Sequence, residues 1–139
     1  MALIVQKFGG TSVGSIERIR AAAQRVAKWK AKGHQLVVVP SAMAGETNRL
    51  LGLASHLQEH PDPRELDVIA STGEQVTIGL LAMALLALGV KARSYAGWQV
   101  KVLTDSAFTR ARIVSIDEKR IRKDLEDDTV VIVAGFQGV

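Results

Sequence analysis

Short apolar runs alternate with longer amphipathic stretches along this chain of 139 residues. Continuous runs rich in β-branched residues are typical of parallel strands that are covered on both faces. Such runs predict strands at residues 2–7, 36–39 and 129–134, and shorter ones at 92–95, 100–103 and 113–116. We expect Pro40 to end the ladder of the second strand, because proline has no N–H to donate.

Four stretches have the spacing of amphipathic helices. The first runs from Ser15, a suitable N-cap, to Gly33, and the second carries the apolar positions from Leu50 to about Glu59, before Pro61 and Pro63. A long helical pattern runs from residue 64 to 89 and is broken in character at residues 71–74. Its second half is apolar on almost all sides, which predicts that this part of the helix is buried in the interior. A charged helix follows from residue 117, where Asp117 is the expected cap, to residue 125.

The alternation of strands and helices predicts an α/β fold, a three-layer αβα sandwich with a mainly parallel sheet, made of one domain or a piece of one. Ligands of such sheets bind beyond the carboxyl ends of the strands. Glycine-rich or polar segments follow three strands, at Gly9, Ser41 and Gly135. We therefore expect these three loops to converge at one edge of the sheet.

Composition narrows the function classes. The net charge is +4, but many basic residues lie in the first helix and aromatic residues are few, so we expect no nucleic acid partner. There is no cysteine for a disulfide or thiolate site, and His34, His56 and His60 are scattered, so we expect no metal site built from side chains. The most apolar run, residues 76–90, is shorter than a bilayer span, and no leader segment is evident. These features predict a cytoplasmic enzyme with no membrane partner.

The segment from Lys7 to Gly14 has the features of an anion-binding loop. It joins a strand to a helix, its glycines allow close backbone approach, and the amides of the following helix would face the ligand. It fits neither the Walker pattern nor the dinucleotide fingerprint, because lysine precedes the glycines and Thr11 stands where a second glycine is needed. The glycines alone favour a simple tight turn, whereas Lys7 and the hydroxyls of Thr11 and Ser12 favour a nucleotide phosphate.

Five segments in this order resemble the aspartate kinases, members of the amino acid kinase fold family. They are residues 7–12 (Lys-Phe-Gly-Gly-Thr-Ser), 41–48 (Ser-Ala-Met-Ala-Gly-Glu-Thr-Asn), 71–74 (Ser-Thr-Gly-Glu), 104–106 (Thr-Asp-Ser) and 135–138 (Gly-Phe-Gln-Gly). Each segment alone is only suggestive, but their order and spacing make the resemblance specific, and it extends over essentially the whole chain.

The resemblance implies transfer of the γ-phosphoryl group of ATP to the β-carboxylate of L-aspartate, the entry step to lysine, threonine and methionine biosynthesis. It implies that Lys7 is catalytic and supplies positive charge to the transferred group. The implied nucleotide-binding residues are Lys7, Phe8, Gly9, Gly10 and Ser12, with Mg²⁺ bridging the phosphates.

The resemblance further implies that Ser41, Thr47 and Glu74 bind aspartate, with the Glu74 carboxylate facing the α-ammonium. Without the resemblance, Thr47 would be interpreted as a helix N-cap and Glu74 as a solvated residue in a first helical turn. Asp105 and Arg112 are explained equally well as surface residues, so they are left out of the catalytic set.

The chain departs from the family pattern in two respects. First, aspartate kinases continue through a Gly-Arg-Gly-Gly-Ser-Asp motif, a nucleotide-binding half and regulatory domains, and these 139 residues contain none of them. Second, Pro40 stands where a small apolar residue is expected before Ser41. We therefore expect an N-terminal portion of the kinase domain, with an apparently truncated fold and little or no activity alone. An open apolar sheet edge would favour a homo-oligomer or other association.

Two alternatives stay open. One is a different amino acid kinase, acting on an acylglutamate or uridylate, although residues 46–48 and 72–74 argue against both. The other is a non-catalytic fragment or interaction module of the same fold.

Overall fold

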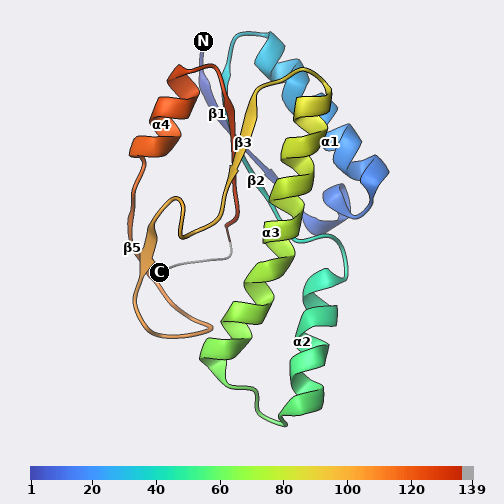
Figure 1. The fold of residues 1–139 in the computed structure, drawn as a ribbon, viewed down its shortest axis with the longest axis vertical. Helices are drawn as coiled ribbons and strands as arrows, with labels where there is room; N and C mark the ends of the chain where they lie inside the picture. The colour runs from blue at the N-terminus through green and yellow to red at the C-terminus, as the bar shows by residue number, and fades with distance from the viewer. Residues whose placement is uncertain (136–139) are drawn as a thin grey trace.

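Four parallel strands form the central sheet in the computed structural model of the chain, which describes residues 1–135 (Figure 1). Their order across the sheet is β1-β2-β6-β3, so chain neighbours β1 and β2 pair directly and β6 is inserted beside β2. The strands are β1 (Leu3–Phe8), β2 (Gln35–Pro40), β6 (Val130–Val133) and β3 (Ala92–Tyr95). A separate antiparallel hairpin joins β4 (Val102–Thr104) to β5 (Ile113–Ile116).

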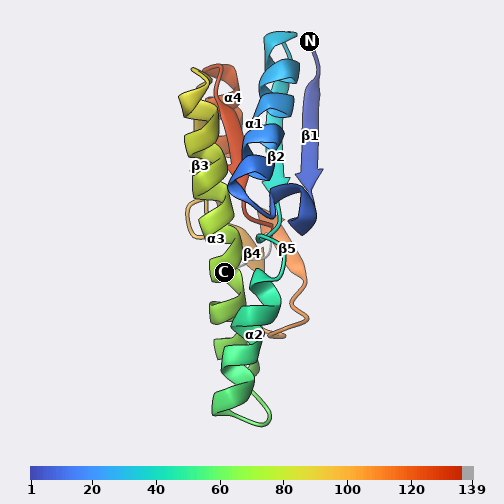
Figure 2. The same ribbon diagram turned by 90° about the vertical axis from the view of Figure 1, so that its right-hand side faces the viewer.

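Helices cover both faces of this sheet. On one face α1 (Ile16–Ala31) and α3 (Pro63–Ala87) pack side by side, and on the other lies α4 (Lys119–Glu126). A short 3₁₀ turn, η1 (Gly10–Val13), separates β1 from α1. Helix α2 (Glu46–Leu57) lies beside the first half of α3, beyond the end of the sheet, as both views show (Figures 1 and 2).

The core follows the alternation of side chains along the strands. Leu36 and Val38 of β2 face α1 and α3, where they join Val26, Leu81 and Leu85 in the larger apolar cluster. The intervening positions face α4, in a second cluster built from Tyr95, Val100, Leu125 and Val131 with Val37 and Val133 at its margin. The expected three-layer α/β sandwich with a mainly parallel sheet is therefore confirmed.

Most helix ends lie where the sequence predicts them. The Ser15 hydroxyl accepts a hydrogen bond from the Arg18 N–H at 3.2 Å, and Gly33 has φ +89°, the left-handed conformation that ends α1. Two starts differ. Helix α2 begins at Glu46, earlier than its apolar positions predict. In α4 the N-cap position is Glu118, one residue later than expected, but the Asp117 carboxylate accepts a hydrogen bond from the Lys119 N–H at 3.1 Å, at the first residue of the helix.

Helix α3 corrects two expectations. Residues 71–74 do not interrupt it, since the helix is continuous from Pro63 to Ala87. Within it the Ser71 and Thr72 hydroxyls donate to carbonyls three residues earlier, at 2.9 and 2.7 Å. Its second half is not wholly buried either, since the side chains of Val76, Met83 and Leu86 are more than half exposed. One face of this second half packs on the sheet, whereas the side with Val76, Met83 and Leu86 is exposed among residues 1–135.

By length and composition α3 is the one helix in residues 1–135 that could cross a membrane. Its packing argues for a different role, because Ile78, Leu81 and Leu85 are buried against the sheet. A helix that fills the core of a globular domain passes the same test of length and composition.

The remaining differences are local. The strand expected at 100–103 is β4 at Val102–Thr104, outside the central sheet. Strand β1 is an edge strand, and Leu3 and Val5 are 52% and 64% exposed. Of the last predicted segment, Phe136, Gln137 and Gly138 lie outside the described residues.

Candidate active site

The carboxyl ends of β1, β2 and β6 meet at one edge of the sheet. The register pairs Phe8 with Pro40, and one residue further on the Ser41 N–H donates to the Phe8 carbonyl at 2.8 Å. On the other side of β2, Gly135 lies so close that a Cβ added there would be 3.1 Å from a methyl carbon of Val39. The three loops predicted to converge, at Gly9, Ser41 and Gly135, therefore do so.

The segment after β1 makes a tight turn. Gly9 is its extended N-cap, the Ser12 N–H donates to the Gly9 carbonyl at 3.0 Å, and the Gly14 N–H to the Thr11 carbonyl at 3.4 Å. In α1 the Ser15 hydroxyl accepts a hydrogen bond from the Arg18 N–H. That the other amides at the start of α1 face a ligand stays a prediction, and the turn itself adds the amides of Gly9 and Gly10.

The predicted nucleotide-binding residues lie on or beside this turn. Lys7, Gly9 and Ser12 are exposed, and Gly10 is half-buried. Phe8 differs, because its side chain is only 7% exposed and belongs to the larger apolar cluster. Its carbonyl is also occupied by Ser41. Phe8 therefore supports the turn from within the core, and its side chain is not positioned to contact a nucleotide.

A cavity of about 260 Å³ opens beside the turn. Four predicted site residues line it together: Gly10 from the turn, Ser41 from the end of β2, Thr47 from α2 and Glu74 from α3. The remaining lining is residues 42–45 and Asn48. One wall therefore belongs to the predicted nucleotide side and the others to the predicted acceptor side. Met43 and Asn48 also line the cavity, although the sequence assigned them no individual role within the 41–48 segment.

In the structure, Thr47 is not a helix N-cap and Glu74 is not in a first helical turn. The N-cap of α2 is Gly45, with φ +80°, and Thr47 is the second residue of the helix. Glu74 lies in the middle of the 25-residue α3, not in its first turn, and is half-buried. Both side chains lie at the cavity because α2 begins where α3 passes the sheet edge.

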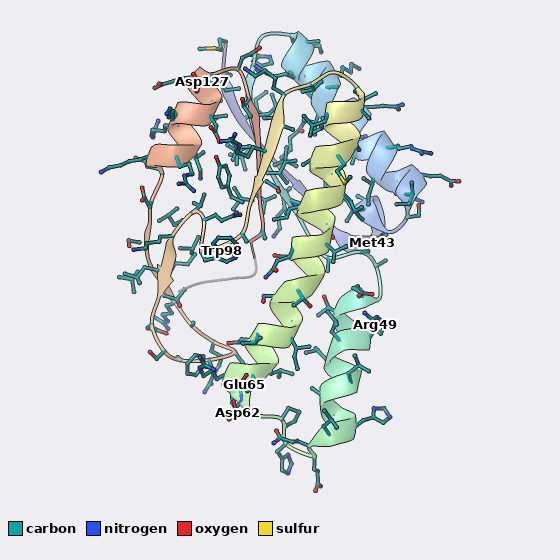
Figure 3. The ribbon with its side chains drawn as sticks, viewed as in Figure 1. Met43, Arg49, Asp62, Glu65, Trp98 and Asp127 are labelled. Carbon is teal, nitrogen blue, oxygen red and sulfur yellow. The ribbon has the colours of Figure 1, made fainter. Side chains whose placement is uncertain are left out.

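A second carboxylate near the cavity, that of Glu46, is held in an ion pair. Arg49 donates to it at 2.6 and 3.1 Å, and this hydrogen bonding lowers the pKa of Glu46. Figure 3 labels Arg49 on the first turns of α2, and Met43 on the segment that leads into that helix. The charge of Glu46 is thereby paired with that of Arg49, and Glu74 is itself among the residues that line the cavity.

The segment at residues 104–106 lies elsewhere. Asp105 accepts hydrogen bonds from the N–H groups of Ala107 and Arg112, at 3.0 and 3.2 Å, so its carboxylate organises the turn between β4 and β5. It lines a different cavity, of about 450 Å³, between that hairpin and α3. This supports leaving Asp105 out of the catalytic set. Within residues 1–135, no three His, Cys, Asp or Glu side chains group to hold a metal ion.

Comparison with known proteins relates this geometry to one family. A profile of the amino acid kinase family matches residues 2–139. The aspartokinase of Pseudomonas aeruginosa is 64% identical over 139 residues, which are 100% of this chain and 34% of that protein. Aspartokinase 2 of Bacillus subtilis is 52% identical over the same share of each.

A solved structure gives the same relationship. The crystal structure of an aspartate kinase from Synechocystis matches with a TM-score of 0.83 at 46% identity, covering 99% of this chain and 22% of that one. The chain therefore spans about a third of the length of the curated relatives it matches.

Proposed function

Because the chain belongs to the amino acid kinase family, we propose that it forms the phosphate-binding and acceptor-binding part of an aspartate kinase. In the proposed reaction, a β-carboxylate oxygen of L-aspartate attacks the γ-phosphorus of ATP. The bond from that phosphorus to the bridging oxygen of ADP breaks, which gives β-aspartyl phosphate. Such a transfer depends mainly on positioning and on electrostatic stabilisation of the phosphoryl oxygens.

The observation that carries this proposal is the cavity shared by Gly10, Ser41, Thr47 and Glu74. Two hydroxyls can hold a carboxylate by hydrogen bonds without adding charge, and a carboxylate can pair with an ammonium. In this proposal Ser41 and Thr47 orient a carboxylate of aspartate, and Glu74 binds its α-ammonium. A cavity of about 260 Å³ is in keeping with a small amino acid.

On the nucleotide side, the turn after β1 offers amides at Gly9 and Gly10, the Ser12 hydroxyl and the exposed lysine at position 7. A lysine beside bare amides is well suited to phosphate oxygens. Mg²⁺ fits a site of this kind, because it is commonly held by substrate phosphates and waters with few protein carboxylates. Bound there, the ion would neutralise charge on the phosphates.

Identity of 64% over the whole chain to an aspartokinase supports the choice of acceptor over an acylglutamate or uridylate. We further propose a cytoplasmic enzyme of amino acid biosynthesis that acts as a homo-oligomer. The exposed Leu3 and Val5 on edge strand β1 favour association through that edge.

The test separates binding from turnover. L-Aspartate and Mg-ADP are titrated separately into the chain and followed by isothermal calorimetry and amide chemical shifts. Turnover is measured as ADP release, with hydroxylamine present to trap an acyl phosphate as the hydroxamate. Acylglutamate and UMP replace aspartate in parallel reactions.

Saturable binding of aspartate with shifts at Ser41, Thr47 and Glu74 supports the proposal, with or without turnover. Aspartyl hydroxamate would extend it to catalysis by the chain alone. Hydroxamate from acylglutamate, or phosphorylated UMP, would identify another kinase of the family. If neither ligand binds, the chain is a non-catalytic module of the same fold.

A further inference from the structure

Helix α3 approaches the cavity through a glycine. A Cβ built on Gly73 would lie 2.9 Å from the Cβ of Ala42, closer than real side chains pack. The next nearest atoms, on Leu50 and Glu46, are at ordinary contact distances of 3.5 and 3.6 Å. A single methyl group therefore occupies the space that a side chain at position 73 would need.

Backbone conformation does not explain this glycine. Gly73 lies within the regular 25-residue α3, where glycine is less favourable than alanine by roughly 0.5–1 kcal/mol. Alanine would fit the helix better, so the close approach to Ala42 is the physical reason that glycine is suited to this position.

The same alanine also contacts the turn after β1. A Cβ on Gly10 would lie 3.1 Å from the Ala42 carbonyl oxygen, and one on Gly14 would lie 3.3 Å from the Ala44 Cβ. Ala42 is 7% exposed and directly follows Ser41. The 41–45 segment is therefore enclosed between the turn on one side and α3 on the other. A Cβ is fixed to the backbone, so it cannot rotate away from a new neighbour.

We propose that Gly73 is a positioning residue: its contact with the Ala42 methyl sets how far the Glu74 carboxylate enters the acceptor cavity relative to Ser41 and Thr47. This inference rests on the proposed function, because the readout of position is the affinity for the α-ammonium of an amino acid. In this proposal, the contact between Gly73 and Ala42 determines the distance between α3 and the 41–45 segment.

The test is a cycle of three variants of the chain: Gly73→Ala, Ala42→Gly and the double variant. Adding a methyl at position 73 displaces α3 from the 41–45 segment, because core overpacking is relieved by backbone shifts. We expect Gly73→Ala to lower the affinity for L-aspartate about tenfold or more. The double variant removes the obstructing methyl and should restore most of that loss. Amide shifts of Thr47 and Glu74 should move in the single variant and return in the double.

Gly79→Ala is the matched control. Gly79 lies in the same helix, and a Cβ there would meet nothing within 4 Å. This variant should keep the aspartate affinity and raise the melting temperature. If Gly73→Ala binds aspartate like the parent chain and leaves the Glu74 amide shift unchanged, the inference is wrong.

Two further outcomes are decisive. Should Gly73→Ala fail to fold, a folded double variant with near-parental affinity supports the inference, and an unfolded double variant overturns it. Should the parent chain bind no aspartate, the proposed function fails. The positioning of Glu74 is then judged from the amide shifts alone, where failure of the double variant to reverse the single variant's changes overturns it.

Discussion

The backbone N–H of Ser41 donates a 2.8 Å hydrogen bond to the carbonyl of Phe8. Pro40, the residue between Ser41 and the rest of β2, has no N–H, so this bond is the last link between the ends of the two strands. It fixes the predicted acceptor residue Ser41 beside the turn that follows β1. The two halves of the proposed site are thus joined through the main chain, which makes their separate contributions testable by side-chain substitution.

Replacement of Lys7 should affect the nucleotide alone. A hydrogen bond to a charged group contributes about 1.5–3 kcal/mol, so Lys7→Met should weaken binding of a non-hydrolysable Mg-ATP analogue, which keeps the γ-phosphoryl group, roughly tenfold to a hundredfold. Calorimetric titration of both ligands measures this. Lys28→Met, at an exposed position late in α1, is the control of equal charge and should bind as the parent does. Unchanged affinity for the ATP analogue in Lys7→Met would remove the lysine from the site.

Replacement of Glu74 should affect the acceptor alone. Glu74→Gln keeps the shape but loses the charge that would pair with an ammonium, so affinity for L-aspartate should fall about tenfold or more, with Mg-ADP binding retained. Succinate, which has the two carboxylates but no ammonium, should bind parent and variant alike. Glu65→Gln, on an exposed turn of the same helix, is the control. Equal losses for aspartate and succinate would contradict the assigned role.

The cap of α1 should contribute measurably to folding. Ser15→Ala removes the acceptor for the Arg18 N–H and should lower the free energy of unfolding by about 1 kcal/mol. Urea denaturation followed by circular dichroism measures the change. Ser55→Ala serves for comparison, since that hydroxyl donates to a carbonyl within α2 and should matter less. If Ser15→Ala lowers the free energy of unfolding no more than Ser55→Ala does, the Ser15 cap does not stabilise α1 measurably.

Stability should fall at alkaline pH through Tyr95. Burial raises the pKa of the Tyr95 phenol above its usual 10.0, and the hydrogen bond donated to Asp124 raises it further, while Arg93 opposes both. A group whose pKa is higher in the folded state stabilises the fold below the unfolded pKa and loses that contribution as pH rises through the folded pKa. The melting temperature should therefore decline above about pH 10.

Tyr95 is the single tyrosine of the chain, so tyrosinate absorbance reports this titration directly. Tyr95→Phe should lower stability at neutral pH by about 1.5–3 kcal/mol, because Asp124 loses a donor. The difference between variant and parent should then shrink as pH rises past 10. A difference that stays constant from neutral to alkaline pH would contradict this account.

Local signals predicted the strands and the cap of α1 because each depends on neighbours in sequence. Residues 36–39 are apolar on both faces and mostly β-branched, Ser15 begins α1 through its own side chain, and Gly33 ends it through its left-handed backbone. The convergence of the loops at Gly9, Ser41 and Gly135 followed from the direction of parallel strands. These expectations required no knowledge of long-range packing.

Tertiary packing decided the features that the local pattern did not reveal. The second half of α3 is apolar all round, but only one face has a sheet to pack on in the described chain. Phe8 lies in a segment that resembles a nucleotide-binding motif, and its burial depends on α1 and α3 rather than on that segment. The approach of Gly73 to Ala42 joins residues 31 positions apart and has no local signature.

Helix α3 carries Glu74 near its midpoint and is anchored beyond it by Leu81 and Leu85. The sheet therefore holds the backbone of this helix, and Glu74 is the one residue through which α3 lines the acceptor cavity. The 41–45 segment contributes five of the lining residues. Efforts to broaden the range of acceptor molecules should therefore begin with that segment and leave the helix untouched.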